Sequence, residues 1–260
     1  MHENGLLQNG LIDRKRELKI SYWLIGISGF FLFSFFIAPY TIPNSSVPEL
    51  SGRANYIDYM GENSWGNIQT KDGKSVGHNQ EEHGGKFLWS ELNPYAALIY
   101  GFGDLNCHQK YERSWSLNGN QMPVCVRDVG IFFGFFLGAI IWSRRGLNRW
   151  TITDSIISTY PSIFYESIYI RGRRSIAVWL FAALAIIPMG LDGGIQAIPY
   201  FNYESNAFMR LATGVPFGLF IGLFFSASIS ARPKYFQDDP SKVWLPLGAR
   251  LIKEDIKESE

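Results

Sequence analysis

The sequence predicts an all-α, polytopic membrane protein with four transmembrane helices and short interfacial helices. Two apolar runs, Ile20 to Val47 and Leu211 to Ala231, contain no Asp, Glu, Lys or Arg. Each run is long enough to cross a bilayer, which takes about 20 apolar residues as a helix. A soluble globular domain is therefore excluded. The 260-residue chain carries a net charge of +1 and has no basic stripe beside aromatic residues, which argues against nucleic acid as a partner.

The N-terminal part predicts an anchored chain with a large polar loop. Residues 1–19 form a polar tail that ends in basic residues, and residues 20–40 form the first span. This span is longer than a signal-peptide core and lacks a small-residue cleavage site, so we expect an uncleaved signal anchor. Residues 41–86 are rich in Gly, Asn, Ser and charge, and they predict an outer loop inserted before a membrane domain at residues 87–230.

A short interfacial helix is predicted at residues 87–103. Asn93 before Pro94 is typical of a helix N-cap followed by proline at the first helical position. The uninterrupted apolar stretch from Tyr95 to Phe102 is too short to span a bilayer. We therefore expect this helix to lie in the membrane interface. The alternative, in which residues 87–103 span the membrane, reverses the orientation of all that follows.

Three further spans are predicted at residues 126–143, 175–196 and 210–231, followed by a polar tail at 232–260. The uncharged part of the second span is about 22 Å long as a helix. A bilayer core is about 30 Å thick, so this helix must include the Arg-Asp pair that precedes the uncharged part. Residues 150–170 alternate Ile and Tyr with charged residues and predict another interfacial helix.

The distribution of basic residues predicts the orientation. Sixteen of the 24 Lys and Arg residues lie in residues 1–19, 143–174 and 232–260. The 84-residue segment 41–124 holds only 6, and segment 198–209 holds none. The positive-inside rule therefore predicts a multi-pass protein of the cell membrane with both termini in the cytoplasm.

This topology brings the unusual polar residues to one outer layer. Asp192 lies 18 residues after Arg174, about 27 Å along the third span. Arg127 and Arg210 begin the second and fourth spans at the same level, where helix N-termini favour anions. Together with Asp128, these charges sum to about zero. We expect one outward-facing polar pocket with His108 and Asp192 as candidate catalytic residues, and with candidate substrate-binding residues Arg113, Arg127, Gln196, Asn206 and Arg210.

Glycine spacing predicts which spans are in contact. The second span carries Gly130, Gly134 and Gly138, and the fourth repeats the same spacing with three glycines from Gly214. Such small-xxx-small stripes let helix backbones approach closely. We therefore expect these two helices to pack along their glycines, which would bring Arg127 and its counterpart on the fourth span to one rim.

The two cysteines allow two interpretations. Thiols on an outer face tend to oxidise, and a disulfide between Cys107 and Cys125 would stabilise the fold by about 3 kcal/mol. The alternative is a zinc site formed by Cys107, His108 and Cys125, with Asp192 or Asp128 as the fourth ligand. Adjacent Cys and His residues suit one tetrahedral ion poorly, so we favour the disulfide and no metal or other cofactor.

The second half carries an ordered set of motifs: Cys107-His108-Gln109, Arg113-Ser114, Pro123-Val124-Cys125-x-Arg127, Gly130-Ile131-x-x-Gly134, Asp192-Gly193-x-x-Gln196 and Asn206-x-x-x-Arg210-x-x-Thr213-Gly214. This ordered set resembles the domain-of-unknown-function 2085 family of small predicted prokaryotic membrane proteins. The resemblance covers about residues 87–230. Many relatives carry a second cysteine in a C-x-R-C motif where this chain has Asp128, which argues against a four-cysteine metal site. The resemblance implies a membrane location and no particular activity.

Two functions fit these residues. The first is action on, or binding of, an anionic lipid head group such as a lipid phosphate, held by the arginines, with His108 and Asp192 as acid and base if the protein is an enzyme. The second is a non-catalytic membrane module that binds a lipid or a protein through the same rim, with the polar residues in a structural role. A transporter is less favoured because four spans offer no paired discontinuous helices.

Overall fold

The structure is a computed structural model that describes residues 6–7, 10–11, 13–52, 57–68, 80–198, 200 and 203–251. The chain forms two compact units. The first unit consists of residues 1–27, 134–187 and 216–260, and the second of residues 28–133 and 188–215. Both predicted tails and the predicted loop at residues 41–86 lie partly outside the described residues.

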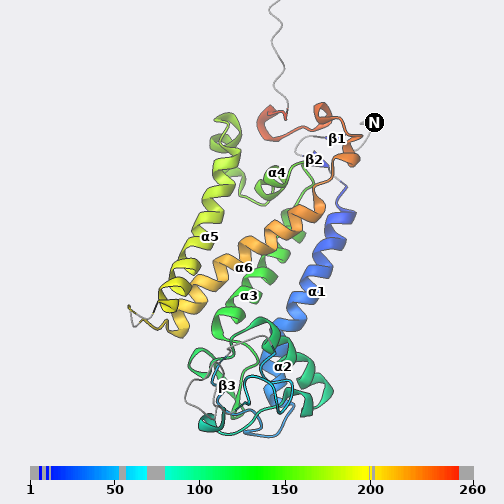
Figure 1. The fold of residues 1–260 in the computed structure, drawn as a ribbon. Helices are drawn as coiled ribbons and strands as arrows, with labels where there is room; N and C mark the ends of the chain where they lie inside the picture. Colours follow the sequence, from blue (N-terminus) through cyan, green and yellow to red (C-terminus); the bar gives the residue numbers. More distant parts are fainter. Residues whose placement is uncertain are drawn as a thin grey trace, which may run out of the picture. The chain divides into compact units, whose positions relative to one another are not determined.

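Four long helices dominate the fold (Figure 1): α1 (Lys15–Ile37), α3 (Val126–Arg145), α5 (Arg174–Ala197) and α6 (Ala207–Ser230). Each contains at least 20 residues, which corresponds to about 30 Å or more of helix. All four are long and apolar enough to cross a membrane. The predicted fold class is therefore confirmed among the described residues.

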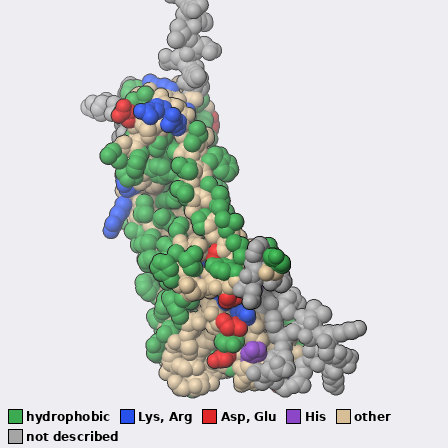
Figure 2. Space-filling model, turned by 90° about the vertical axis from the view of Figure 1, so that its left-hand side faces the viewer, with side chains coloured by type: hydrophobic (Ala, Val, Ile, Leu, Met, Phe, Trp, Pro, Cys, Tyr) green, Lys and Arg blue, Asp and Glu red, His purple; other side chains and the backbone are tan. Residues whose placement is uncertain are grey.

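The long helices present large apolar side chains on their surfaces. Trp23 on α1 and Trp179 on α5 are 66% and 75% exposed, and Figure 2 shows hydrophobic side chains over much of the surface that the helices offer. Water-soluble proteins rarely expose continuous apolar patches of this kind. In a bilayer, the same surface is the part of the protein that contacts lipid tails.

Helices α3 and α6 are in backbone contact within each unit, as their glycines predict. In the first unit, a Cβ atom added to Gly222 would lie 2.6 Å from the carbonyl oxygen of Phe135. In the second unit, a Cβ atom added to Gly214 would lie 2.6 Å from the carbonyl oxygen of Arg127. All six glycines of the two stripes are buried. Only glycine permits this approach, because any side chain would collide with the opposite backbone.

In the first unit, arginines from the start of the chain cap two long helices. Arg14 donates hydrogen bonds to the carbonyl oxygens of Trp142 and Ser143, at 3.0 and 2.8 Å, where α3 ends. Arg16 donates to the carbonyl oxygen of Ser230 at 2.9 Å, where α6 ends. The last carbonyl groups of a helix lack partners within the helix and favour positive charge. Part of the basic tail thus stabilises helix ends.

The segment 150–170 is not the single helix that the sequence predicts. Helix α4 (Ile152–Ile157) is followed by a 3-10 helix, Ser162–Phe164, and by a π-helical turn, Glu166–Ile170. Pro161 separates α4 from these turns, and proline cannot continue an α-helix because it lacks the N–H group and clashes with the preceding turn. Buried apolar residues of the segment pack against the C-terminal part of the same unit.

In the second unit, α2 (Pro94–Asn106) is the short helix predicted from the Asn-Pro pair. The side-chain oxygen of Asn93 accepts a hydrogen bond from the N–H of Ala96 at 3.0 Å, and Pro94 is the first helical residue. Thirteen residues give about 20 Å of helix, less than the thickness of a bilayer core. Both the cap and the helix are therefore confirmed by the structure.

Aromatic rings connect α2 to its neighbours in the second unit. Phe102 on α2 stacks on Phe31 of α1, with ring centroids 4.0 Å apart. Phe132 of α3 meets Phe35 of α1 edge to face, with centroids 5.1 Å apart. Such pairs contribute about 0.5–1.5 kcal/mol beyond the area that they bury, so this contact fixes α2 beside α1 and α3.

A small hairpin precedes α3. Strands β3 (Ser116–Leu117) and β4 (Asn120–Gln121) pair antiparallel across an Asn-Gly turn in which both residues have positive φ, 51° and 67°. Asn-Gly favours this turn because both residues tolerate the left-handed region. The buried side chain of Asn120 accepts a hydrogen bond from the N–H of Val47 at 2.8 Å. The hairpin thereby holds the loop that follows α1.

The remaining elements are short. Strands β1 (Leu6–Leu7) and β2 (Gly10–Leu11) pair antiparallel in the first unit. The other helical turns are 3-10 helices at Ala38–Tyr40, Gln80–His83, Trp89–Glu91, Tyr111–Arg113, Pro233–Phe236, Pro240–Lys242 and Pro246–Gly248.

Candidate functional site

Five parts of the second unit converge on one group of polar side chains: the 3-10 helix Tyr111–Arg113, the first turn of α3, the end of α5, the loop before α6, and the first turn of α6. We call this group the arginine cluster. Helix α6 starts after Asn206, whose side-chain oxygen accepts a hydrogen bond from the N–H of Met209 at 2.9 Å. This N-cap fixes the direction in which the helix leaves the loop. The arginine cluster consists of Arg113, Arg127, Asp192, Gln196, Tyr203, Glu204 and Arg210.

Asp192 is the anion of the first ion pair. It is buried on α5, and its Oδ2 atom pairs with the Nη2 atom of Arg127 on α3. Its Oδ1 atom accepts a hydrogen bond from the Tyr203 hydroxyl at 2.9 Å. Burying an unpaired carboxylate would cost several kcal/mol, so these two donors explain how Asp192 is tolerated. Both oxygens are occupied, and Asp192 acts here as a fixed counter-ion.

Arg210 is almost fully buried in the first turn of α6. Its guanidinium group donates to the carbonyl oxygen of Ser205 at 3.0 Å, to Oε1 of Gln196 at 3.2 Å and to Oε1 of Glu204 at 3.0 Å. Gln196 lies one helical turn beyond Asp192 on α5, so Arg210 is hydrogen-bonded to the same end of α5 that carries the first ion pair. The predicted convergence of Asp192, Gln196 and Arg210 is thus present in the structure.

Glu204 is shared by two arginines. Arg113 approaches it in a bidentate manner, with Nε 2.8 Å from Oε1 and Nη2 3.3 Å from Oε2, and Arg210 donates to the same Oε1 atom. Partial burial opposes the charge of Glu204, but the hydrogen bond from Arg113 and the charges of both arginines outweigh it and lower the pKa of its carboxyl. The Glu204 side chain is 48% exposed, so this pair is reachable from outside.

The arginine cluster has more donors and more positive charge than it can use internally. Three guanidinium groups face two carboxylates, which leaves a net charge of +1 among these five groups. The carboxyl of Asp128, next to Arg127, is not counted here because it accepts a hydrogen bond from the Cys125 thiol. Two buried donor atoms, Nε of Arg127 and Nε2 of Gln196, have no hydrogen-bond partner among the described residues. Buried donors are rarely left without an acceptor. The arrangement therefore suits an additional acceptor that carries negative charge.

The two cysteines form a second group, the thiol cluster, which consists of Cys107, Cys125 and Asp128. The predicted disulfide is wrong: the cysteine sulfurs are 3.6 Å apart and both are unbridged, whereas a disulfide requires about 2.05 Å. The Cys125 thiol instead donates to Oδ2 of Asp128 at 3.2 Å. Burial raises the pKa of the Cys107 thiol well above its usual range, which opposes its oxidation through the thiolate.

Two predicted site residues occupy other positions. His108 is exposed and directly follows Cys107 of the thiol cluster in the chain. Asn206 serves as the N-cap of α6. The sequence prediction did not include Glu204 or Tyr203. A signal existed, because Glu204 is the single charged residue in segment 198–209 and precedes a buried arginine.

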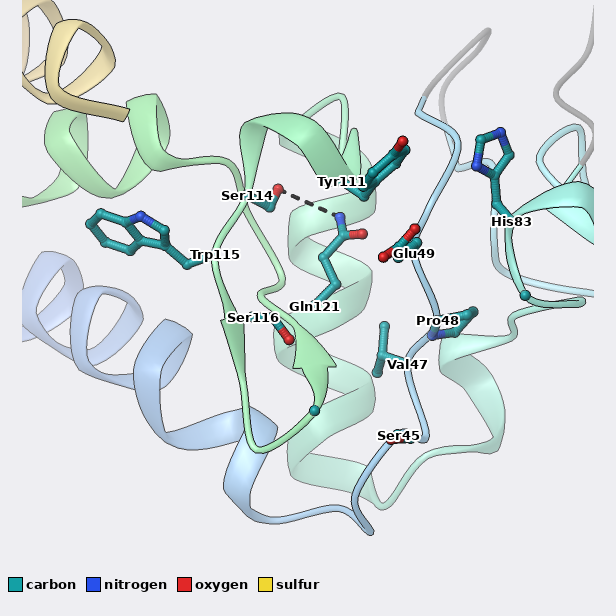
Figure 3. Close-up of a pocket in the computed structure, with 12 residues that line it drawn as sticks. Ser45, Val47, Pro48, Glu49, His83, Tyr111, Ser114, Trp115, Ser116 and Gln121 are labelled. Carbon is teal, nitrogen blue, oxygen red and sulfur yellow. Dashed lines mark hydrogen bonds between the residues drawn. The ribbon is translucent and has the colours of Figure 1, made fainter. Parts of the chain in front are cut away.

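A separate cavity of about 590 Å³ opens in the second unit beside the hairpin. Figure 3 shows Gln121 pointing toward Ser114, to whose hydroxyl it donates a hydrogen bond at 3.5 Å. The residues of this cavity come from the loop after α1 and from segment 111–121. The arginine cluster contributes none of the residues that line it.

Four long apolar helices with a buried ionic cluster at the start of two of them define a multi-pass helical membrane protein. The chain belongs to the family described as predicted membrane protein, DUF2085, which matches residues 107–224. It is similar to an uncharacterized protein of Methanothermobacter thermautotrophicus, with 33% identity over 113 residues that cover 44% of this chain and 78% of that protein.

A second relative is an uncharacterized protein of Methanocaldococcus jannaschii, with 29% identity over 117 residues. These residues cover 45% of this chain and 58% of that protein. No solved structure matches the chain significantly. The family match begins at Cys107 and includes every residue of the arginine cluster and the thiol cluster. Both groups thus lie in the part of the chain that the family shares.

Proposed function

We propose that this membrane protein binds the anionic head group of a lipid, such as a phosphate monoester, at the arginine cluster. The observation that carries the proposal is the surplus of donors: three guanidinium groups share two carboxylates, and two buried donor atoms lack a partner. A phosphate monoester brings nearly two negative charges and three acceptor oxygens. It supplies what the cluster lacks.

Glu204 supports the proposal because it already occupies an anion position. One carboxylate accepts hydrogen bonds from Arg113 and Arg210 at 2.8 and 3.0 Å, and its side chain is 48% exposed. A phosphate with higher charge competes for the same two guanidinium groups, since Arg–phosphate pairs are among the stronger charge-assisted contacts. In this proposal, Glu204 neutralises the arginines until a head group replaces it.

Binding is better supported than turnover. Asp192, a candidate catalytic residue from the sequence, accepts hydrogen bonds on both carboxylate oxygens, from Arg127 and Tyr203, so it holds a neighbour in place and has no vacant base position. With both termini in the cytoplasm, as the basic residues predict, the cluster would meet lipids of the outer leaflet of the cell membrane.

The test is a lipid titration of the detergent-purified full chain, followed by native mass spectrometry. Phosphatidic acid is expected to bind more tightly than phosphatidylcholine. Arg113→Gln removes a bidentate pair, and hydrogen bonds to charged groups contribute about 1.5–3 kcal/mol, so we expect the Kd for phosphatidic acid to rise about 10- to 100-fold. Glu204→Gln is expected to lower that Kd, because it removes the competing carboxylate.

The matched control is Arg250→Gln in the first unit, where the guanidinium carbon lies 4.5 Å from the ring centroid of Trp244. This variant changes the net charge by the same amount as Arg113→Gln and is expected to leave the Kd unchanged. Equal affinity for the two lipids would contradict the proposal. Weaker binding by Glu204→Gln would show that Glu204 holds the arginines in place and does not compete with the ligand.

A further inference from the structure

The thiol cluster brings three metal-ligating atoms together at the start of α3. Cys125 is the residue before α3, and Asp128 lies in the first helical turn, so residues three apart face the same side. Cys107 comes from the end of α2. The two sulfurs and a carboxylate oxygen all lie within 4.8 Å of one another. Both cysteines are buried.

The spacing of the sulfurs is that of two thiolates on one ion. They are 3.6 Å apart without a bond. Zinc–sulfur bonds of about 2.3 Å at tetrahedral angles place two thiolates about 3.8 Å from each other. The third atom, Oδ2 of Asp128, is 3.2 Å from the Cys125 sulfur. The ligand atoms are thus already gathered at nearly the separation that a small cation imposes.

Two backbone N–H groups donate to the sulfur of Cys107. Its sulfur accepts hydrogen bonds from the N–H groups of Cys125 and Gln109, at 3.1 and 3.5 Å. Gln109 has a positive φ of 49°, a turn conformation that points its N–H group back at the sulfur. Backbone N–H groups placed in this way also stabilise a thiolate, the form in which a cysteine binds a metal ion.

We propose that Cys107, Cys125 and Asp128 bind a divalent ion of the zinc class. Two thiolates and one carboxylate are ligands that zinc accepts, whereas magnesium and calcium require oxygen ligands alone. On binding, the two thiols release their protons to solvent, and the ion takes the place of the hydrogen bond between Cys125 and Asp128. Three protein ligands leave one tetrahedral position for water or for an outside ligand. This site is separate from the proposed head-group site.

The test uses the detergent-purified full chain, prepared with reductant and stripped of metal. One equivalent of Zn²⁺ is expected to bind, measured by competition with a chromophoric chelator, and Co²⁺ is expected to give thiolate-to-cobalt charge-transfer absorption. Mutation of a residue that hydrogen-bonds to a metal ligand lowers metal affinity about 10- to 100-fold. Replacing a ligand itself, in Cys107→Ser or Cys125→Ser, should therefore lower the affinity for Zn²⁺ at least about 100-fold. Glu112→Gln, which changes an exposed carboxylate of the same unit, is the matched control and should bind Zn²⁺ as the wild type does.

A gain-of-ligand variant keeps the test decisive if the serine variants fail to fold. Asp128→Cys offers three thiolates where the wild type has two, so the cobalt charge-transfer intensity should rise by about half. Unchanged zinc affinity in both serine variants would overturn the proposal. So would the absence of zinc binding by the reduced wild type. Unchanged cobalt absorption in Asp128→Cys would remove Asp128 from the ligand set and overturn the site as proposed.

Discussion

Gly222→Ala is predicted to destabilise the protein through contact between two backbones. The added Cβ atom would lie 2.6 Å from the carbonyl oxygen of Phe135 and 3.1 Å from its Cα atom. Backbone atoms cannot move aside as a flexible side chain does, so α3 and α6 must separate. Overpacking of this kind costs about 1–3 kcal/mol, against which the higher helix propensity of alanine returns up to about 1 kcal/mol.

Thermal unfolding in detergent micelles measures this effect. A net loss of about 1–2 kcal/mol corresponds to a fall in Tm of about 2–8 °C for a chain of this size. Gly26→Ala on α1 is the matched control, because no atom outside the surrounding turns of its own helix lies within 4 Å of its added Cβ atom. In this control only the higher helix propensity of alanine acts, so its Tm should equal or exceed that of the wild type. A Gly222→Ala protein with the same Tm as Gly26→Ala would refute the packing argument.

Two further predictions concern charge and topology. The pKa of Glu204 is lowered in the folded protein, so its ion pairs stabilise the fold above its ordinary pKa of 4.5 and are lost as the pH falls through the folded value. Unfolding measured from pH 7 to pH 3 should therefore show a smaller loss of stability in Glu204→Gln than in the wild type, and parallel curves would contradict the assignment. Ser116→Cys, at an exposed hairpin position, should react with an impermeant thiol reagent from outside intact cells, and labelling from the cytoplasmic side alone would reverse the topology.

Features encoded within one segment could be predicted from the sequence. Asn93 and Pro94 specify the start of α2 because the cap and the proline act within four residues of each other. The four long helices follow from local composition alone. The α3–α6 contact was also predictable, since Gly214 and Gly222 repeat at the period of one helix face. In each case the physical cause lies inside the segment that shows the pattern.

Features that depend on distant partners could not be predicted in the same way. The prediction of a disulfide rested on compartment and chain separation, but the rotation of Cys125 toward Asp128 is decided by where α3 begins. Glu204 escaped prediction because its importance comes from Arg113, 91 residues earlier in the chain. The segment 150–170 has helical composition, but Pro161 limits the length of each turn.

The first turn of α3 makes three separate contacts, and these restrict where residues can be inserted into or deleted from the chain. The carbonyl oxygen of Arg127 meets α6 at Gly214, its side chain pairs with Asp192 on α5, and the next residue, Asp128, faces Cys125. Inserting or deleting one residue inside this turn would rotate the later residues by about 100° and break these contacts together. Variation in length among relatives should therefore fall in the connecting loops, and this turn should keep its register.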